Sequence, residues 1–313
     1  MERSESPGPP RFPRRALAAL LGCALALAGG SASGAVPEWS AAASLLLPGA
    51  GQMANGEWSA GGAQMGLAFV LARQAQILQL SPDYLESDQR TDNANMLVHV
   101  NRTSYEADLY NGALLNLSFY SSFAAYRDAR AAMGNQGYST PLPREGLADL
   151  AAAPFQWEHL RRATTWAPLL VVLYLAAEPP TAQRYLYQPE GSLSRDDLRA
   201  GAFFQDGMVA VGEETFFRGV LNTGLSDSLG EGWGLVSSSA LFGLAHQGSP
   251  GQATIAGASL FGLYLGLLQQ ENDYRLGQGV AIHFWWDFLV TLGMLQERKP
   301  GQAVQLLRVS IPF

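Results

Sequence analysis

Two adjacent carboxylates stand in an apolar stretch of the chain, the segment VGEETFFRGV at 211–220. Glu214 and Arg218 are four residues apart with the acid first, which is the favourable order for an ion pair on a helix. Glu213 then projects about 100° away from Glu214. Because burying a charge without a partner costs several kcal/mol, we expect the arginine to neutralise one carboxylate while the other faces a functional partner.

Two of the four histidines in the chain lie on apolar segments further along. His246 ends the segment FGLAH, which begins at Phe242, and His283 begins HFWWD, which ends at Asp287. Each motif alone is compatible with a structural hydrogen bond. A carboxylate and a histidine from different helices are able to hold and deprotonate a water molecule, and a second histidine is able to donate to an oxyanion. Peptide-bond hydrolysis is the chemistry that such a set supports.

The sequence lacks the motifs of the common peptidase classes. Neither HExxH nor GxSxG occurs, and the single cysteine, Cys23, lies in the apolar N-terminal segment. Zinc is an alternative, because Glu213, His246, His283 and Asp287 together supply two nitrogen and two oxygen ligands. A metal-free mechanism needs fewer assumptions, so we expect no cofactor and keep Zn²⁺ as the alternative.

Long uncharged runs predict that these motifs lie on transmembrane helices. Charged residues make up 15% of the chain, against roughly 25% in soluble domains. Residues 163–177 contain no charge, and 232–270 is an uncharged run long enough for two spans with a turn at 246–252. The expected helices cover about 163–178, 198–222, 233–247, 253–269 and 277–296. We therefore predict an all-α fold, specifically a polytopic transmembrane helix bundle.

The remaining segments complete the expected domain organisation. Residues 1–35 have an Arg-bearing start, an apolar stretch and a small-residue end, which is the layout of a secretory signal. We expect cleavage after Ala35, with an uncleaved membrane anchor as the alternative. Residues 36–130 form an N-terminal membrane module, with an aqueous loop at 81–107 and a span at 109–126. Residues 131–162 are a linker, 163–297 the catalytic domain and 298–313 a tail.

Charge indicates the partners and the location. The net charge of −7 and the lack of a dense basic cluster argue against nucleic-acid binding. We expect the partners to be the lipid bilayer and a membrane-associated protein or peptide. The bias of the basic residues toward arginine is typical of a GC-rich bacterial genome, so we expect the bacterial inner (cytoplasmic) membrane. His99 is expected to be solvated, and His159 to lie at the membrane edge.

The three motifs together resemble those of the CPBP family, which contains type II CAAX prenyl endopeptidases and bacteriocin-processing or self-immunity proteins. EETFFR fits EExxxR, FGLAH fits FxxxH and HFWWD fits HxxxN/D, in the order of the family. The segment FGLYLG at 261–266 is similar to its glycine-bearing helix. The resemblance covers roughly 165–296 and implies an intramembrane endopeptidase.

The resemblance also implies a role for each motif residue. Glu213 would activate water with His246, and His283 with residue 287 would form the oxyanion site. The supporting residues would be Glu214, Arg218 and Phe242. Several family members carry Asn at the position of Asp287, and Asn can donate a hydrogen bond as an ionised Asp cannot. Either Asp287 is protonated, or it orients and charges His283; we favour the second hypothesis.

Two other function classes stay open. One is a non-catalytic membrane scaffold or bacteriocin-immunity-type protein of the same fold, and the other is a proton-coupled carrier that uses the same ionisable groups. Intact motifs argue against the scaffold, and the lack of two repeated halves with broken helices argues against the carrier. In the N-terminal module, PGAGQ at 48–52 resembles the hairpin of TM2 and DUF5683 membrane modules. That resemblance indicates no chemistry.

Overall fold

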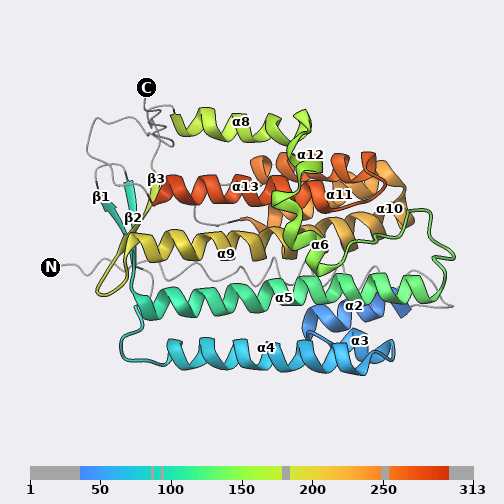
Figure 1. Cartoon of the computed structure of the whole chain (residues 1–313), viewed down its shortest axis with the longest axis horizontal. Helices are drawn as coiled ribbons and strands as arrows, with labels where there is room; N and C mark the ends of the chain where they lie inside the picture. Colours follow the sequence, from blue (N-terminus) through green and yellow to red (C-terminus); the bar gives the residue numbers. More distant parts are fainter. Residues whose placement is uncertain (1–35, 86–87, 93–94, 178–183, 248–253, 296–313) are drawn as a thin grey trace.

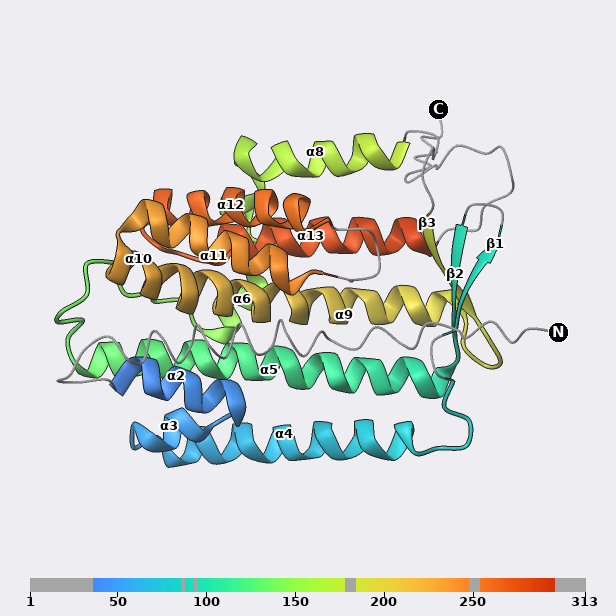
Figure 2. The same ribbon diagram turned by 180° about the vertical axis from the view of Figure 1, so that it is seen from behind.

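The computed structural model describes residues 36–85, 88–92, 95–177, 184–247 and 254–295. Long helices run side by side in it, and a small sheet lies at one end of the bundle (Figure 1). From one side to the other, the layers are α4, α5, α9, α13 and α8, and the reverse view has the same order (Figure 2). The predicted signal at 1–35 and the predicted tail at 298–313 lie outside the described residues.

The described helices fall into three groups along the chain. The first contains α2 (Val36–Leu46), α3 (Ala50–Ala54), α4 (Trp58–Gln79) and α5 (Arg102–Ala132). Short elements follow, namely α6 (Leu147–Ala152), the 3-10 turn η1 (Ala153–Phe155) and α7 (Trp157–Leu160). The last group contains α8 (Ala163–Ala177), α9 (Arg195–Glu213), the π-helix η2 (Glu214–Asn222), α10 (Thr223–Leu229), α11 (Glu231–Ala245), α12 (Ile255–Glu271) and α13 (Gly277–Met294).

The prediction of a mainly helical fold is confirmed. Each helix expected after residue 162 has a counterpart, although the segment expected as one helix at 198–222 is divided between α9 and the π-helix η2. Helix α9 also starts earlier than expected. Ser194 accepts a hydrogen bond from the backbone N–H of Asp197, and the Asp197 carboxylate accepts one from the backbone N–H of Ser194. This capping box fixes the first turn of the helix.

The described residues also contain three strands, which the sequence did not predict and which form a small sheet. Strand β1 (Asp88–Asp92) pairs antiparallel with β2 (Asn95–Val100), and β2 pairs parallel with β3 (Arg184–Pro189). The polar composition of 81–107 predicted an aqueous loop there. Val98 and Val100 are nevertheless buried on either side of the half-buried His99, which is the alternation of a strand. The parallel partner lies far along the chain, so local sequence does not reveal it.

The transmembrane helices predicted for the bundle are not found among the described helices. Across the described ranges, no helix is both long enough and apolar enough to cross a membrane. Helix α8 is apolar but has 15 residues, whereas α5 has 31 residues and carries charged side chains near both of its ends.

One hydrophobic cluster joins α5 to the π-helix η2. Phe119 and Phe123 of α5 are buried in the same cluster as Phe216 and Phe217 of η2. The rings of Phe119 and Phe216 are stacked, with centroids 4.7 Å apart. A Cβ added at Gly219 would lie 2.4 Å from the Phe123 ring, so glycine there permits the close approach of the two helices. Helix α5 therefore packs closely against η2 through these aromatic side chains.

The PGAGQ segment forms a tight turn between α2 and α3. Gly49 has a φ of 93°, in the left-handed region that favours glycine. A Cβ added at Gly51 would lie 2.0 Å from the carbonyl oxygen of Ser40. The side chain of the buried Gln52 donates to the carbonyl oxygen of Ser121 in α5, at 2.9 Å. The turn is thereby fixed to α5, and its resemblance to TM2 and DUF5683 modules stays a prediction.

A buried ion pair joins the end of α5 to α10. Arg130 is fully buried, and its Nη1 lies 3.4 Å from a carboxylate oxygen of Asp227. Asp227 also accepts hydrogen bonds from the backbone N–H groups of Ser139 and Thr140, at 2.7 and 2.8 Å. The segment that follows α5 is thus held on the C-terminal helices by one carboxylate.

We expect the Asp227→Asn variant to lower the free energy of unfolding by about 3–5 kcal/mol, because it leaves the Arg130 guanidinium buried without a counter-charge. The measurement is equilibrium unfolding in one detergent. Asp196→Asn is the control, since Asp196 is 88% exposed in an ion pair with Arg199, and its effect should stay within about 0.5 kcal/mol. A loss for Asp227→Asn no larger than for this control would contradict the expectation.

Candidate active site

The four residues predicted to carry the chemistry lie together in the structure. Glu213 ends α9, His246 follows α11, and His283 and Asp287 lie on α13. Oε2 of Glu213 is 3.5 Å from Nε2 of His246 and 3.8 Å from Nε2 of His283. Three helices therefore converge on one carboxylate oxygen.

Oε2 of Glu213 is buried, and it accepts no hydrogen bond from any described residue. Its distances to the two imidazole nitrogens are longer than good direct hydrogen bonds. At such separations a water molecule is able to contact both groups at once. The Glu213 side chain is 18% exposed, so the site is reachable from outside.

The orientation of His246 is fixed by the end of its own helix. Nδ1 lies 2.8 Å from the carbonyl oxygen of Phe242, and a carbonyl oxygen only accepts, so Nδ1 carries the proton. In the neutral ring Nε2 is then an acceptor, and it faces Glu213. Two acceptors side by side suit a water molecule that donates both of its protons and keeps its lone pairs for attack.

The side chains of Glu214 and Arg218 form an ion pair, with 3.1 Å between Oε1 and Nη1. Both are almost fully buried. The Arg218 guanidinium lies over the ring of Phe242, 4.3 Å from its centroid, and its Nη2 donates to the carbonyl oxygen of Gly262 at 3.3 Å. The backbone is a π-helix here, which the sequence did not predict. Turns of this kind frequently occur at functional sites.

The sequence also did not predict a contact between His283 and Glu214. Nδ1 of His283 lies 2.8 Å from Oε1 of Glu214, and Nε2 lies 3.3 Å from Oδ2 of Asp287. Both ring nitrogens therefore face carboxylates, so the doubly protonated ring has a partner for each proton. Motif spacing relates His283 to Asp287 on one helix, but it gives no relation to a residue 69 positions earlier. Glu214 and Asp287 thus lie against opposite nitrogens of the same ring.

A further carboxylate, Asp206, lies on α9 two turns before Glu213. The residue is buried, and its Oδ2 has no hydrogen-bond partner among the described residues. It interacts with Asp287 and Thr291 of α13. In the sequence Asp206 is a lone acid with no charged partner at helical spacing, so spacing gives no signal of its proximity to α13.

The zinc alternative does not fit this arrangement. Among the described residues, no group of three or more His, Cys, Asp or Glu side chains is placed to hold a metal ion. Nδ1 of His283 is engaged by Glu214, and Nε2 faces Asp287. The expectation that the protein needs no cofactor stays a prediction.

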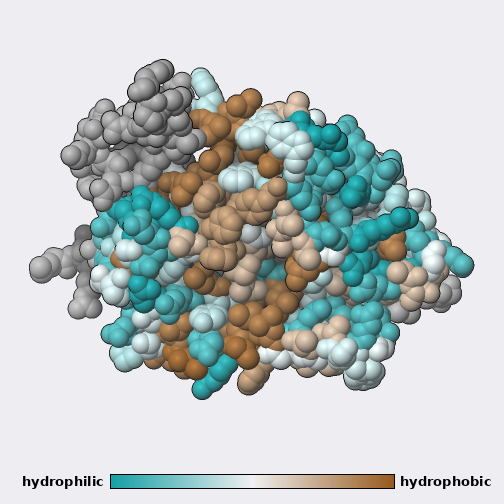
Figure 3. Space-filling view, in the orientation of Figure 1, coloured by the Kyte–Doolittle hydropathy of each residue, from teal (hydrophilic) through white to brown (hydrophobic). Residues whose placement is uncertain are grey.

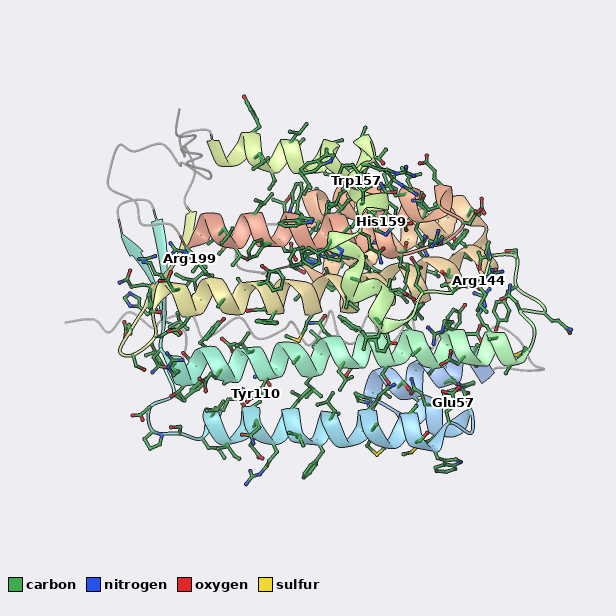
Figure 4. The ribbon with its side chains drawn as sticks, in the orientation of Figure 1. Glu57, Tyr110, Arg144, Trp157, His159 and Arg199 are labelled. Atoms are coloured by element: carbon green, nitrogen blue, oxygen red, sulfur yellow. The ribbon has the colours of Figure 1, made fainter. Side chains whose placement is uncertain are left out.

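The other two histidines take no part in this set. Nδ1 of His99 pairs with the Glu190 carboxylate, so His99 is not simply solvated. His159 lies on α7 beside α13 (Figure 4). It is buried, and burial lowers its pKa. A Cβ added at Gly277 would lie 2.6 Å from Nε2 of His159, so the residue packs against the start of α13 and is not at an exposed edge.

Residues 202–289 match the family model of the type II CAAX prenyl endopeptidase Rce1-like proteins. The matched segment runs from α9 to α13 and contains Glu213, His246, His283 and Asp287. Over this segment the match confirms the predicted resemblance. The Rce1-like family is a protease family, and its proteins are membrane proteins. No curated protein and no solved structure matches the chain.

Proposed function

We propose that the protein is an intramembrane endopeptidase that hydrolyses a peptide bond of a membrane-associated protein or peptide. The observation that carries this proposal is Oε2 of Glu213, which is buried without a hydrogen-bond partner among the described residues and lies beside the Nε2 atoms of His246 and His283. A buried carboxylate oxygen without a partner is costly, and one such oxygen in a structure calls for an explanation. In our proposal a bound water molecule is the hydrogen-bond partner of this oxygen.

In this mechanism Glu213 is the general base. The water donates one hydrogen bond to Oε2 of Glu213 and the other to Nε2 of His246, whose tautomer is set by the Phe242 carbonyl. Its lone pair attacks the peptide carbonyl carbon, and Glu213 takes the proton as the new C–O bond forms.

His283 then stabilises the oxyanion of the tetrahedral intermediate through its Nε2 proton, which faces Asp287 before the substrate binds and turns to the oxyanion as it forms. Glu214 holds the ring at Nδ1, and Arg218 neutralises Glu214. Glu213 passes its proton to the leaving nitrogen as the C–N bond breaks. The products are a new carboxylate and a new amino terminus, and Glu213 is ionised again.

The Asp287→Asn variant distinguishes two roles for residue 287. If Asp287 charges and orients His283, as we favour, kcat should fall by about tenfold, less than the roughly hundredfold cost of losing a whole oxyanion donor, because Glu214 still holds the ring. If residue 287 donates directly to the oxyanion, Asn is competent and the variant should match or exceed wild type. The measurement is kcat for a membrane-anchored reporter, with both proteins in the same detergent.

We also propose an integral position in a membrane, and for this chain the bacterial inner membrane. Many large apolar side chains are exposed on helices at the outside of the bundle: Leu67, Phe69, Val70 and Ile77 of α4, and Trp166, Leu170, Val171 and Tyr174 of α8. An apolar band crosses the bundle near its middle, with hydrophilic surface toward both ends (Figure 3). An exposed apolar surface of this extent suits contact with lipid chains.

Comparison of membrane proteomes tests the proposed function in cells. Cells with the wild-type protein should contain new termini in membrane-associated proteins, and cells with Glu213→Gln should lack them. If the two proteomes have the same termini, the non-catalytic scaffold becomes the better hypothesis. Solute uptake by reconstituted vesicles that follows an imposed proton gradient would instead support the carrier.

A further inference from the structure

A buried amide network lies between η2, α11 and α12, beneath the proposed active site. Asn222, at the end of η2, is 0% exposed, and Gln269 of α12 is 3% exposed. Nδ2 of Asn222 donates to Oε1 of Gln269 at 2.7 Å, and Oγ of Ser238 in α11 donates to Oδ1 of Asn222 at 3.2 Å. Nε2 of Gln269 donates to the carbonyl oxygen of Arg218 at 2.9 Å. The network thus connects α11 and α12 by hydrogen bonds to η2, and it includes the peptide group of Arg218 in η2.

The direction of each hydrogen bond follows from the chemistry at the Arg218 end. The Arg218 carbonyl oxygen only accepts, so Gln269 must present its NH₂ group there and its oxygen to Asn222. Asn222 must then present its NH₂ to Gln269 and its oxygen to the Ser238 hydroxyl. A buried network that is satisfied in one arrangement specifies one packing of the helices.

The peptide group that accepts from Gln269 is that of Arg218, within the π-helix η2. The Arg218 carbonyl oxygen also accepts from the backbone N–H of Thr223, and from its hydroxyl at 2.9 Å. Helix α12 contacts Arg218 at both ends, because Gln269 holds its carbonyl group and the Gly262 carbonyl oxygen accepts from its guanidinium. Since the π-helix is a rare conformation, contacts from outside the helix are suited to stabilise it here.

Two contacts connect the Arg218 side chain to His283, so a displacement of the Arg218 peptide would also shift the His283 ring. The Arg218 guanidinium lies 3.1 Å from Oε1 of Glu214, and the same oxygen lies 2.8 Å from Nδ1 of His283. A misplacement of about 1 Å in a catalytic group can cost roughly a hundredfold in rate. The network is therefore placed to set the position of the His283 ring.

We propose that Gln269 and Asn222 are positioning residues, which fix the π-turn so that Arg218 and Glu214 hold His283 where it can bind the oxyanion. They act through Arg218 and contact none of the groups given a chemical role. The kinetic consequence rests on the proposed peptidase function, whereas the effect on the position of His283 does not.

The substitution Gln269→Met removes the donor to Arg218 and keeps the length of the side chain. Gln52→Met is the matched control, because Gln52 is 1% exposed and also donates to a backbone carbonyl, that of Ser121, at 2.9 Å. Both variants should lower the unfolding midpoint by similar amounts. We expect kcat to fall by about tenfold or more for Gln269→Met with KM within about twofold, and kcat to stay within about twofold of wild type for Gln52→Met.

The ring nitrogen resonances of His283, in protein labelled at histidine, provide a measurement that needs no turnover. Gln269→Met should move the Nδ1 resonance of His283, and Gln52→Met should not. If Gln269→Met does not fold, Ser238→Ala, which removes only the far donor of the network, should move the same resonance and lower kcat to a smaller extent.

The possible results distinguish the positioning role of Gln269 from the proposed peptidase function. A His283 resonance that moves in Gln269→Met, in a protein whose wild type cleaves no reporter, supports the positioning role and counts against the proposed function. An active wild type whose kcat and His283 resonance are unchanged by Gln269→Met overturns the positioning role. Equal losses of kcat in Gln269→Met and Gln52→Met also overturn it, because both amides would then be merely structural.

Discussion

The Glu213→Gln variant is expected to lose turnover by about a thousandfold, within the range that a general base contributes, while the protein stays folded. Gln keeps the shape of the side chain but cannot take the proton of the water. Oε2 of Glu213 has no hydrogen-bond partner among the described residues, so the substitution breaks no bond at that atom. The measurements are kcat for a membrane-anchored reporter and the unfolding midpoint in the same detergent.

A matched control for this variant exists on α7. Glu158 also has a carboxylate oxygen 3.5 Å from a histidine Nε2, that of His159, but it is 49% exposed and outside the proposed site. Glu158→Gln should therefore leave kcat within about twofold of wild type. Wild-type turnover by Glu213→Gln would rule out its role as the base.

The neighbouring variant, Glu214→Gln, is expected to lower both the rate and the free energy of unfolding, the latter by about 3–5 kcal/mol. Glu214 is 1% exposed, and its Oε1 faces both the Arg218 guanidinium and Nδ1 of His283. Gln leaves Arg218 buried without a counter-charge, and it removes the charge that holds the imidazolium. Equilibrium unfolding compared with that of Glu213→Gln measures the difference.

A double variant separates the two effects at Glu214. Because replacing both partners of a buried pair by apolar residues is often neutral, Glu214→Leu combined with Arg218→Met should recover much of the lost stability. It should stay inactive, since His283 loses the carboxylate that holds its Nδ1. If Glu213→Gln and Glu214→Gln were equally stable and equally active, the division of roles between the two carboxylates would be wrong.

The local contacts of the site were predictable from spacing, whereas the contacts between helices were not. The spacing of Glu214 and Arg218 predicted their ion pair, and that of His283 and Asp287 predicted one shared face. The pairing of Glu214 with His283 and of Asn222 with Gln269 depends on how the helices pack, which no local pattern encodes. The chemistry of the three motifs and their resemblance to a family suggested that they meet, but gave none of the contacts between them.

In the fold, too, local elements were predictable from the sequence and long-range pairings were not. The uncharged run 232–270 predicted two helices, and α11 and α12 lie there, with 248–253 between them outside the described residues. Helix α5 was predicted as a span at 109–126, but its capping box at Asn101 starts it earlier, within the segment interpreted as a polar loop. The parallel pairing of β2 with β3 is not predictable from local sequence, because the two strands are far apart in the chain and meet only when the helices pack.

The purified protein in liposomes, given a membrane-anchored peptide reporter in water enriched in heavy oxygen, provides the decisive test of water activation by Glu213. If water activated by Glu213 attacks the peptide bond, mass spectrometry of the product should show one heavy-oxygen atom in the new carboxylate for wild type, and no product for Glu213→Gln. Products formed at the same rate by both proteins, or no product from wild type over a panel of reporters that vary in sequence and lipid anchor, would contradict the account.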